Sequence, residues 1–313
     1  MKSLATRFSL ALKGMAMGIA EVIPGVSGGT IAFITGIYEE LINTIKTVLS
    51  TRWLRALRQE GIGAAWKALN GNFLLFLLAG MATGVILGVF GVTALLENYP
   101  ELLWAFFFGL IVASALYIGR QVTRWSAVEF IALLSGTLLA YYITVASPAQ
   151  GTEALWFVFI AGAIAISALI LPGISGSFML LLMGMYTFFI PMVKDAIKSF
   201  IPECLLVVGV FGLGCLLGLA TFSRVLSWTF KHYKNPTLAL LTGFIIGSLN
   251  KIWPWRNVLS YRENSKGEQV PFIEKSVLPA QYDGEAMIIW VILLMFIGFI
   301  AVFAIERLGR SQT

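Results

Sequence analysis

A run of 40 residues, from Ala154 to Val193, contains no Asp, Glu, Lys or Arg. A helix needs only about 20 apolar residues to cross a bilayer, so this run is long enough to enter a membrane and return. Other charge-free runs lie on both sides of it, and the whole chain is 58% hydrophobic and 12% charged, with a mean hydropathy of +0.86. These values are typical of an integral membrane protein, and they exclude soluble enzymes and nucleic-acid-binding proteins.

The chain contains an internal repeat. Residues 20–42 align without gaps with residues 168–190, at a constant offset of 148, and both segments contain a P-G-x-S-G core. The identical pairs are Pro24 and Pro172, Gly25 and Gly173, Ser27 and Ser175, Gly28 and Gly176, Gly36 and Gly184, and Tyr38 and Tyr186. A weaker similarity relates GLIVAS at Gly109 to GFIIGS at Gly243. We therefore divide the chain into repeats of residues 1–150 and 151–313.

The distribution of basic residues predicts how the repeats are oriented. Lys and Arg are concentrated in cytoplasmic loops, so segment 46–70, with five basic residues and one acidic residue, is predicted to be cytoplasmic. Both termini and the basic loops near residues 120 and 231 are placed on the same side. Segments 97–101 and 147–153 carry no basic residue and are placed outside. The span at 204–227 then runs inward, whereas its counterpart at 73–96 runs outward, and the repeats are inverted.

We therefore predict an all-α integral membrane protein with two inverted repeats, each made of a helical re-entrant hairpin and three transmembrane helices. The first repeat comprises a hairpin at 14–45, a basic interfacial segment at 46–70, and spans at 73–96, 102–119 and 127–147. The second comprises a hairpin at 154–193, spans at 204–227, 235–250 and 286–306, and an external loop at 251–285 of unknown purpose. The sequence leaves the oligomeric state open.

The hairpin tips carry the candidate binding site. Proline and glycine end the first arm, and the serine after them is placed to cap a new helix whose first amides have no partner within it. Two such helix N-termini, entering from opposite faces, would form an anion site near the bilayer centre. The substrate-binding candidates are Pro24, Gly25, Ser27, Gly28, Gly29 and Thr30 in the first tip and Pro172, Gly173, Ser175, Gly176 and Ser177 in the second. The alternative is that proline and glycine only kink packed helices.

Three charged residues are further candidates. Glu21 lies three residues before the first break, where a carboxylate is costly, and the second repeat has Leu169 there. A nearby phosphate would favour its protonated form, so Glu21 is a candidate proton carrier, although cation coordination or an interfacial position would also fit. Arg120 and Arg224 border apolar runs and are secondary phosphate-contact candidates, with snorkelling to the interface as the alternative.

The remaining features indicate no metal or cofactor. His232 is the only histidine, and Cys204 and Cys215 lie within one apolar run, as packing residues do. The segment at 51–69 alternates basic residues with Trp and Leu, a pattern typical of an interfacial helix that attracts anionic lipids. Guidance of a substrate headgroup is the alternative role for this segment.

The first copy of the repeat, MGIAEVIPGVSGGTIAFITGIYEEL, resembles the signature of the bacterial polyprenyl-phosphate transporter family, and the likeness extends through PGISGS to most of the chain. The resemblance implies translocation of undecaprenyl phosphate across the bacterial cytoplasmic (inner) membrane, for reuse of this lipid in peptidoglycan synthesis. It also implies a headgroup site at the two tips. Rocking of one repeat against the other would give alternating access. The resemblance does not establish coupling to H⁺ or Na⁺, or the direction of net flux.

Two other functions remain open. A transporter or channel for a small anion could use the same helix N-termini. The P-G-x-S hairpins also resemble those of membrane undecaprenyl-pyrophosphate phosphatases, but neither tip here contains His, and PGISGSF contains no Arg. Hydrolysis would need a general acid or a charge clamp on the leaving phosphate, and the tips offer neither, so we expect that the protein is not an enzyme.

Overall fold

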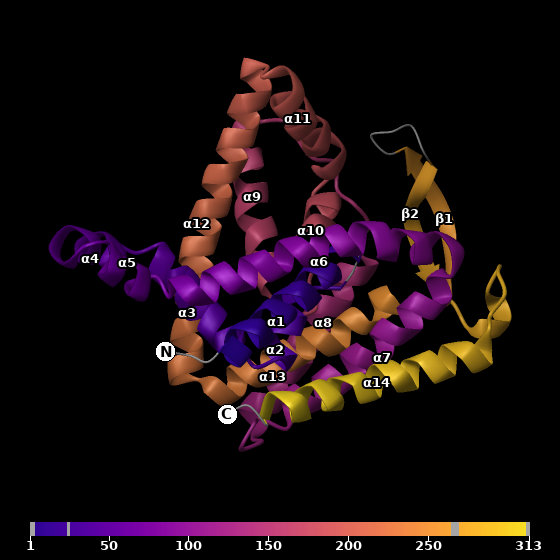
Figure 1. Cartoon of the computed structure of the whole chain (residues 1–313). Helices are drawn as coiled ribbons and strands as arrows, with labels where there is room; N and C mark the ends of the chain where they lie inside the picture. Colours follow the sequence, from indigo (N-terminus) through magenta and orange to yellow (C-terminus); the bar gives the residue numbers. More distant parts are fainter. Residues whose placement is uncertain (1–3, 24–25, 264–268, 311–313) are drawn as a thin grey trace.

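The computed structural model describes residues 4–23, 26–263 and 269–310 and is largely helical (Figure 1). The first half contains α1 (Leu4–Val22), α2 (Gly28–Ile34), α3 (Tyr38–Val48), α4 (Arg52–Glu60), α5 (Ile62–Ala68), α6 (Gly71–Asn98), α7 (Pro100–Gly119) and α8 (Ala127–Val145). The second half contains α9 (Leu155–Ile170), α10 (Gly176–Leu182), α11 (Tyr186–Ser199), α12 (Pro202–His232), α13 (Lys234–Ser248), η1 (Leu249–Ile252), β1 (Arg256–Glu263), β2 (Gln269–Ser276), η2 (Pro279–Gln281) and α14 (Ile288–Arg310).

Four helices in the described part of the chain are long and apolar enough to cross a membrane: α6, α7, α8 and α12. A fifth span would be the bent pair of α10 and α11, and α9 and α14 contribute shorter apolar helices. The helix α13 has only 15 residues, or about 22 Å, and most of its side chains are buried. Because protein surrounds α13, its length does not have to match the thickness of the lipid.

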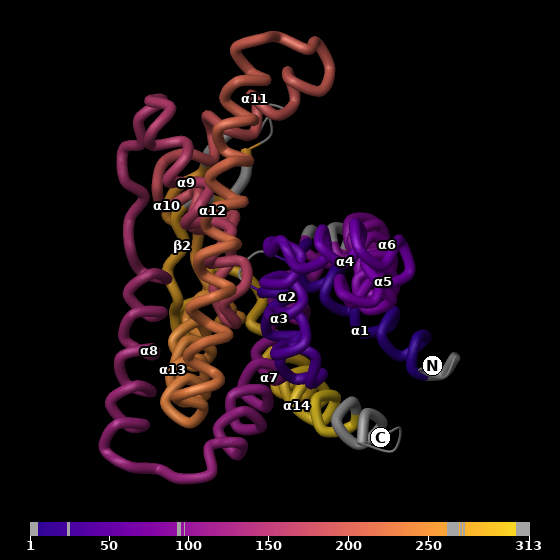
Figure 2. Tube along the Cα trace, turned by 90° about the vertical axis from the view of Figure 1, so that its left-hand side faces the viewer, coloured from indigo at the N-terminus to yellow at the C-terminus, as the bar shows by residue number. Residues whose placement is uncertain are grey.

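One helix pair is matched between the two halves. The helix α1 packs along α6, as α9 packs along α12. The remaining long helices pair across the halves, α7 with α14 and α8 with α13 (Figures 1 and 2). The two halves are therefore joined through their helices as well as through the chain.

Glycines explain why these pairs form. A methyl group on Gly84 of α6 would overlap the Met15 carbonyl oxygen of α1, and one on Gly214 of α12 would overlap that of Phe159 in α9. At the crossings between the halves, Gly109 lies against the carbonyl of Met295, and Gly243 against that of Leu133. Close backbone approach of this kind is how small residues stabilise helix pairs in lipid. The weak similarity around Gly109 and Gly243 thus marks two equivalent crossings.

The second arm of each hairpin is broken, a feature that the sequence did not predict. Gly36 and Gly184, an identical pair in the repeat, have φ of +74° and +68°. Each follows a seven-residue helix, and the next amide returns to the helix, from Ile37 to the Ala32 carbonyl and from Met185 to the Leu180 carbonyl. This is the Schellman arrangement, in which glycine adopts the left-handed conformation without a steric penalty. The chain turns by 118° between α10 and α11.

The loop at 251–285 is also more ordered than expected, because it contains a two-stranded antiparallel sheet of β1 and β2. The prediction of an all-α chain is corrected there. The two strands contain Val258, Tyr261 and Ile273, residue types that favour extended backbone. In Figure 1 this sheet lies at the right of the molecule, whereas α4 and α5 project at the left.

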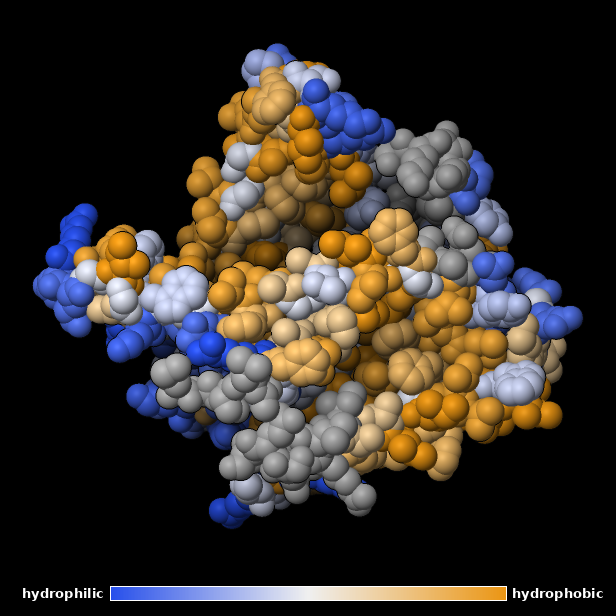
Figure 3. Space-filling model, viewed as in Figure 1, coloured by the Kyte–Doolittle hydropathy of each residue, from blue (hydrophilic) through white to orange (hydrophobic). Residues whose placement is uncertain are grey.

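The surface has the character of a membrane protein. Exposed large apolar side chains are numerous on α6, α8, α12 and α14. Figure 3 shows them as broad hydrophobic areas over α12 and α14, with hydrophilic residues at the outer end of α4 and α5. An apolar surface of this extent is stable against lipid and not against water.

Candidate functional site

The first tip is buried and internally hydrogen-bonded. Ser27 is the N-cap of α2, as predicted, and its Oγ accepts a hydrogen bond of 3.1 Å from the Gly29 amide. The Gly28 amide donates to Glu21 Oε1 at 2.8 Å, from the end of α1. A Cβ at position 28 would lie 2.6 Å from that carboxylate oxygen, so a larger residue there would displace the Glu21 side chain from its bond to the amide. The Glu21 carboxylate thus lies where an anion at this helix N-terminus would bind.

The two tips, 143–144 residues apart in sequence, are in direct contact. The Gly173 amide donates to Thr30 Oγ1 at 3.0 Å, and Ser27 Oγ donates to the Leu171 carbonyl at 3.3 Å. Ser27 and Thr30 are fully buried. Gly29 lies so close to the second tip that a Cβ there would be 2.7 Å from the Ile170 carbonyl oxygen. The structure therefore brings together the two copies of the motif.

The second tip differs from the first. Ser175 stands at the N-cap position of α10, but its side chain makes no cap hydrogen bond and instead lies 3.0 Å from Ser177 Oγ. The expectation that the second tip repeats the first is therefore wrong for this cap. Position 169 is leucine, whose Cβ lies near Gly176 where the first tip has the Glu21 carboxylate beside Gly28, and Ser177 is exposed. The two tips are chemically unequal: the first is closed by its own side chains, and the second presents hydroxyls.

A small cavity of about 10 Å³ lies beside the second tip. Ser175, Gly173 and Thr144 line it together with Phe178 and Lys251. Its volume corresponds to about one water molecule, so a phosphate group would need the surrounding side chains to move. The cavity connects the candidate tip to the loop that follows α13.

The other candidates lie elsewhere. Pro24 and Gly25 are outside the described residues. Arg224 donates to the Leu49 carbonyl at 3.1 Å and so caps the end of α3. Arg120 stacks on Phe303 and lines a separate, largely apolar cavity of about 470 Å³ between α7, α8 and α13. Neither arginine contacts a tip. In the described part of the chain, no cluster of His, Cys, Asp and Glu is arranged to hold a metal ion.

Sequence reasoning missed two residues at the site. Tyr38, at the start of α3, is buried, and its hydroxyl donates to the Ile170 carbonyl at 3.1 Å, adding a third bond between the first hairpin and the region of the second tip. The identity of Tyr38 with Tyr186 in the repeat is the sequence feature that could have indicated a role for Tyr38 at the site. Lys251 lines the cavity, but in sequence it is only a lysine bordering an apolar run.

The arrangement is chemically suited to bind oxygen atoms. The amides of Gly28, Gly29 and Gly173 each donate to an oxygen of the protein itself, from a carboxylate or a hydroxyl. A phosphate presents several acceptor oxygens and could replace these partners without leaving a buried donor unpaired. The tips would have to separate before the Gly173 amide could take part, because its bond to Thr30 joins the two tips, whereas the Gly28 and Gly29 amides bond within the first tip.

Comparison with known proteins gives a consistent result. Residues 17–270 match the family described as undecaprenyl phosphate translocase-like. A polyprenyl-phosphate transporter of Vibrio cholerae is 43% identical over 275 residues, which cover 88% of this chain and 87% of that protein. A polyprenyl-phosphate transporter of Staphylococcus aureus is 32% identical over 257 residues, covering 78% of this chain and 85% of that protein. No solved structure matches the chain.

Proposed function

Since the chain belongs to the undecaprenyl phosphate translocase-like family, we propose that it moves undecaprenyl phosphate across the bacterial cytoplasmic membrane. Its relatives are named as transporters of polyprenyl phosphate, and its apolar helices make it a membrane protein. The observation that carries the proposal is the meeting of the two tips, through the Thr30 hydroxyl and the Gly173 amide. The phosphate headgroup binds between them while the isoprenoid tail stays in lipid.

The transport step is a movement of one half against the other. An uncatalysed phosphate monoester faces a cost of tens of kcal/mol in hydrocarbon by Born estimates, and the tip amides and hydroxyls replace its water. The matching order of helices and the charge distribution support inverted repeats with both termini in the cytoplasm. Separation of the tips toward one side and then the other gives alternating access. In this mechanism, the contact between the tips corresponds to an arrangement closed to both sides.

Glu21 couples the headgroup to a cation in this mechanism. Its carboxylate holds the Gly28 amide when no phosphate is present. A phosphate cannot take this amide while a like charge remains beside it, so Glu21 is protonated or paired with Na⁺ as the headgroup enters. The second tip has no equivalent carboxylate, and one cation therefore accompanies each headgroup.

The test is headgroup translocation in proteoliposomes. We expect Ser27→Ala combined with Ser175→Ala to slow the movement of undecaprenyl phosphate about tenfold or more, because hydrogen bonds worth about 1 kcal/mol each are lost from the bound headgroup. The matched control is Ser114→Ala combined with Ser167→Ala, because both of these hydroxyls bond only to carbonyls of their own helices. This control should translocate as the wild type does.

Three results would count against the proposal. If the wild type does not accelerate translocation under any proton or sodium gradient, while it carries inorganic phosphate, the protein is a small-anion transporter. Release of phosphate from undecaprenyl pyrophosphate would identify an enzyme. If the double variant at the tips translocates as fast as its control, the headgroup site lies elsewhere.

A further inference from the structure

The loop after α13 carries a cluster of two cations and one carboxylate, and one of the cations, Lys251, lies at the second tip. Lys251 Nζ and Arg256 Nη1 lie 3.7 Å and 3.0 Å from Glu274 Oε2 on β2. The side chain of Arg256 is 7% exposed, and those of Lys251 and Glu274 are each 20% exposed. The Lys251 ammonium also lies 4.6 Å from the ring centre of Phe178, on α10. A cation on the loop therefore touches the helix that begins at the second tip.

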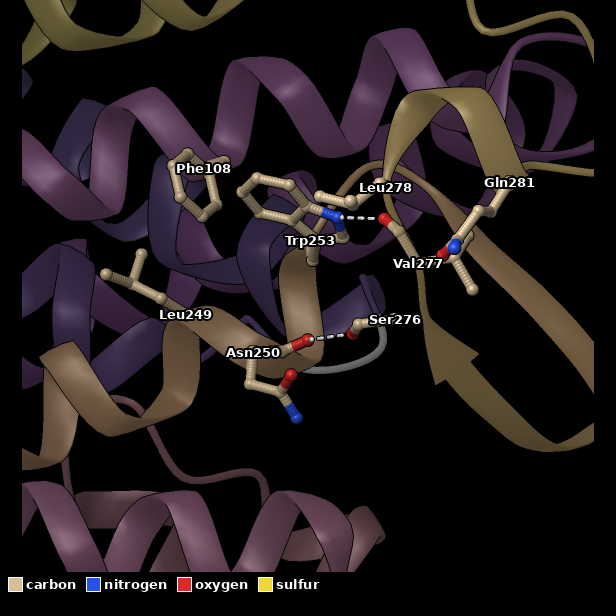
Figure 4. Close-up of a pocket in the computed structure, with 8 residues that line it drawn as sticks. All are labelled: Phe108, Leu249, Asn250, Trp253, Ser276, Val277, Leu278 and Gln281. Carbon is tan, nitrogen blue, oxygen red and sulfur yellow. Dashed lines mark hydrogen bonds between the residues drawn. The ribbon is translucent and has the colours of Figure 1, made fainter.

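The backbone around Lys251 is held firmly, as Figure 4 shows for its neighbours. Ser276 Oγ donates to the Asn250 carbonyl at 3.2 Å, and Trp253 Nε1 donates to the Val277 carbonyl at 2.8 Å. The Asn250 side chain donates through Nδ2 to Thr144 Oγ1 at 2.8 Å, which fixes the loop to α8. These hydrogen bonds attach the sheet to η1 and to the end of α8, and they fix the backbone position from which the Lys251 side chain extends.

The cluster has more positive than negative charge. Among the described residues, Glu274 is the one carboxylate within ion-pair distance of Lys251 or Arg256. The Arg256 Nε–H is buried and has no hydrogen-bond partner in the same part of the chain. Burial, and then the neighbouring guanidinium, lowers the pKa of the Lys251 ammonium. A buried cation short of counter-charge is stabilised by an anion that reaches it.

Lys251 and the candidate headgroup site at the second tip share a cavity. Lys251 lines it together with Ser175 and with Gly173, whose amide is the one that donates to Thr30. Because the cavity holds about one water molecule, an arriving phosphate has to displace a side chain. Glu274 and the phosphate would compete for the Lys251 ammonium, so movement of Glu274 away from Lys251 would leave the ammonium available to the phosphate.

We propose that Lys251 binds a phosphate monoester at the second tip and that Glu274 is the internal counter-ion which this phosphate displaces. The inference rests on the proposed function in taking the phosphate to be a lipid headgroup, but the anion site itself does not require a lipid. On the side predicted to face the outside, Lys251 receives the phosphate and Ser175 and Gly173 then share it. Binding of the phosphate would thus be the function of the loop at 251–285, for which the sequence indicated none.

The test is equilibrium binding to the full-length protein in detergent, with undecaprenyl phosphate, inorganic phosphate and undecaprenol as probes. We expect Lys251→Gln to weaken binding of undecaprenyl phosphate about tenfold or more. Glu274→Gln removes the competitor and should tighten binding severalfold. The control is Lys275→Gln, since Lys275 is an exposed lysine next to Glu274 on β2, and it should bind as the wild type does. Undecaprenol, without a phosphate, should not distinguish the variants.

A purely structural cluster predicts a different pattern. If the ion pairs only anchor the sheet, Lys251→Gln and Glu274→Gln would both lower the unfolding temperature and weaken binding to a similar degree, and the proposal would be wrong. It would also be wrong if Lys251→Gln bound both phosphate probes as the wild type does, even where translocation is intact. Conversely, Lys251-dependent binding of inorganic phosphate, without binding or movement of the lipid, would keep the anion site and reject the proposed function.

Discussion

A single methyl group at Gly109 is expected to destabilise the whole protein. Gly109 in α7 lies against the Met295 carbonyl in α14, and in return Gly298 lies against the Phe106 carbonyl. Gly109→Ala forces these backbones apart, which costs about 1–3 kcal/mol by analogy with overpacked cores. Because this crossing joins the two halves, we expect an earlier thermal unfolding transition, measured by tryptophan fluorescence in detergent, and reduced translocation.

The control for this substitution is Gly212→Ala in α12. Apart from the adjacent residues and the backbone of its own helix, no atom of the described residues lies within 4 Å of a Cβ at that position, so the methyl group would enter open space or lipid. Alanine favours the helix over glycine by about 1 kcal/mol at both positions. The difference between the unfolding temperatures of the two variants therefore measures the effect of the crossing between α7 and α14. Equal unfolding temperatures for the two variants would show that the contact between Gly109 and Met295 does not limit stability.

Glu21→Leu should have the largest effect on transport. It places at the first tip the residue type that the second tip already has in Leu169, and it removes a charged partner from the Gly28 amide. In the proposed mechanism Glu21 takes up a proton or Na⁺ as the headgroup enters, and leucine cannot do so; losing an interaction with a charged group, worth about 1.5–3 kcal/mol, should slow headgroup translocation on the order of 100-fold. Glu21→Gln keeps an acceptor oxygen and loses the charge, and it should translocate without responding to a proton or sodium gradient.

These two variants separate the roles of Glu21. A carboxylate that only orders the tip would be replaced well by glutamine, and the gradient response of Glu21→Gln would then match that of the wild type. Glu39→Gln is the control, because Glu39 is exposed and pairs at 2.8 Å with Lys234 at the surface. Flux through proteoliposomes of defined internal pH and sodium concentration gives the measurement. An unchanged gradient response in Glu21→Gln would remove Glu21 from the coupling step.

The repeat was the most informative part of the sequence. It paired Ser27 with Ser175 and Gly28 with Gly176, and the structure brings the two motif copies into contact. Capping by Ser27 followed from the chemistry of a hydroxyl before unpaired amides. The breaks at Gly36 and Gly184 were missed because glycine is common in membrane helices, and only its φ angle distinguishes a turn from a packing contact.

Contacts that depend on distant parts of the chain could not be predicted. Ser175 has the same sequence context as Ser27, yet its side chain bonds to Ser177 because the second tip has serine where the first has glycine. Lys251 borders an apolar run much as Arg120 does, and nothing local distinguishes a snorkelling cation from one turned toward a tip. Its position is set by the pairing of β1 with β2 and by the bonds from Asn250, which join residues far apart in sequence.

The exchange of helices between the halves has a consequence for biosynthesis. When α7 and α8 leave the ribosome, their partners α14 and α13 have not been made, and the glycine faces around Gly109 and Gly136 have only lipid or the insertion machinery against them. The first half therefore completes its packing more than a hundred residues after it has been synthesised. A nascent chain that stalls within α12 would expose these two glycine faces to the cell's quality-control proteases, although the spans of the first half are already inserted.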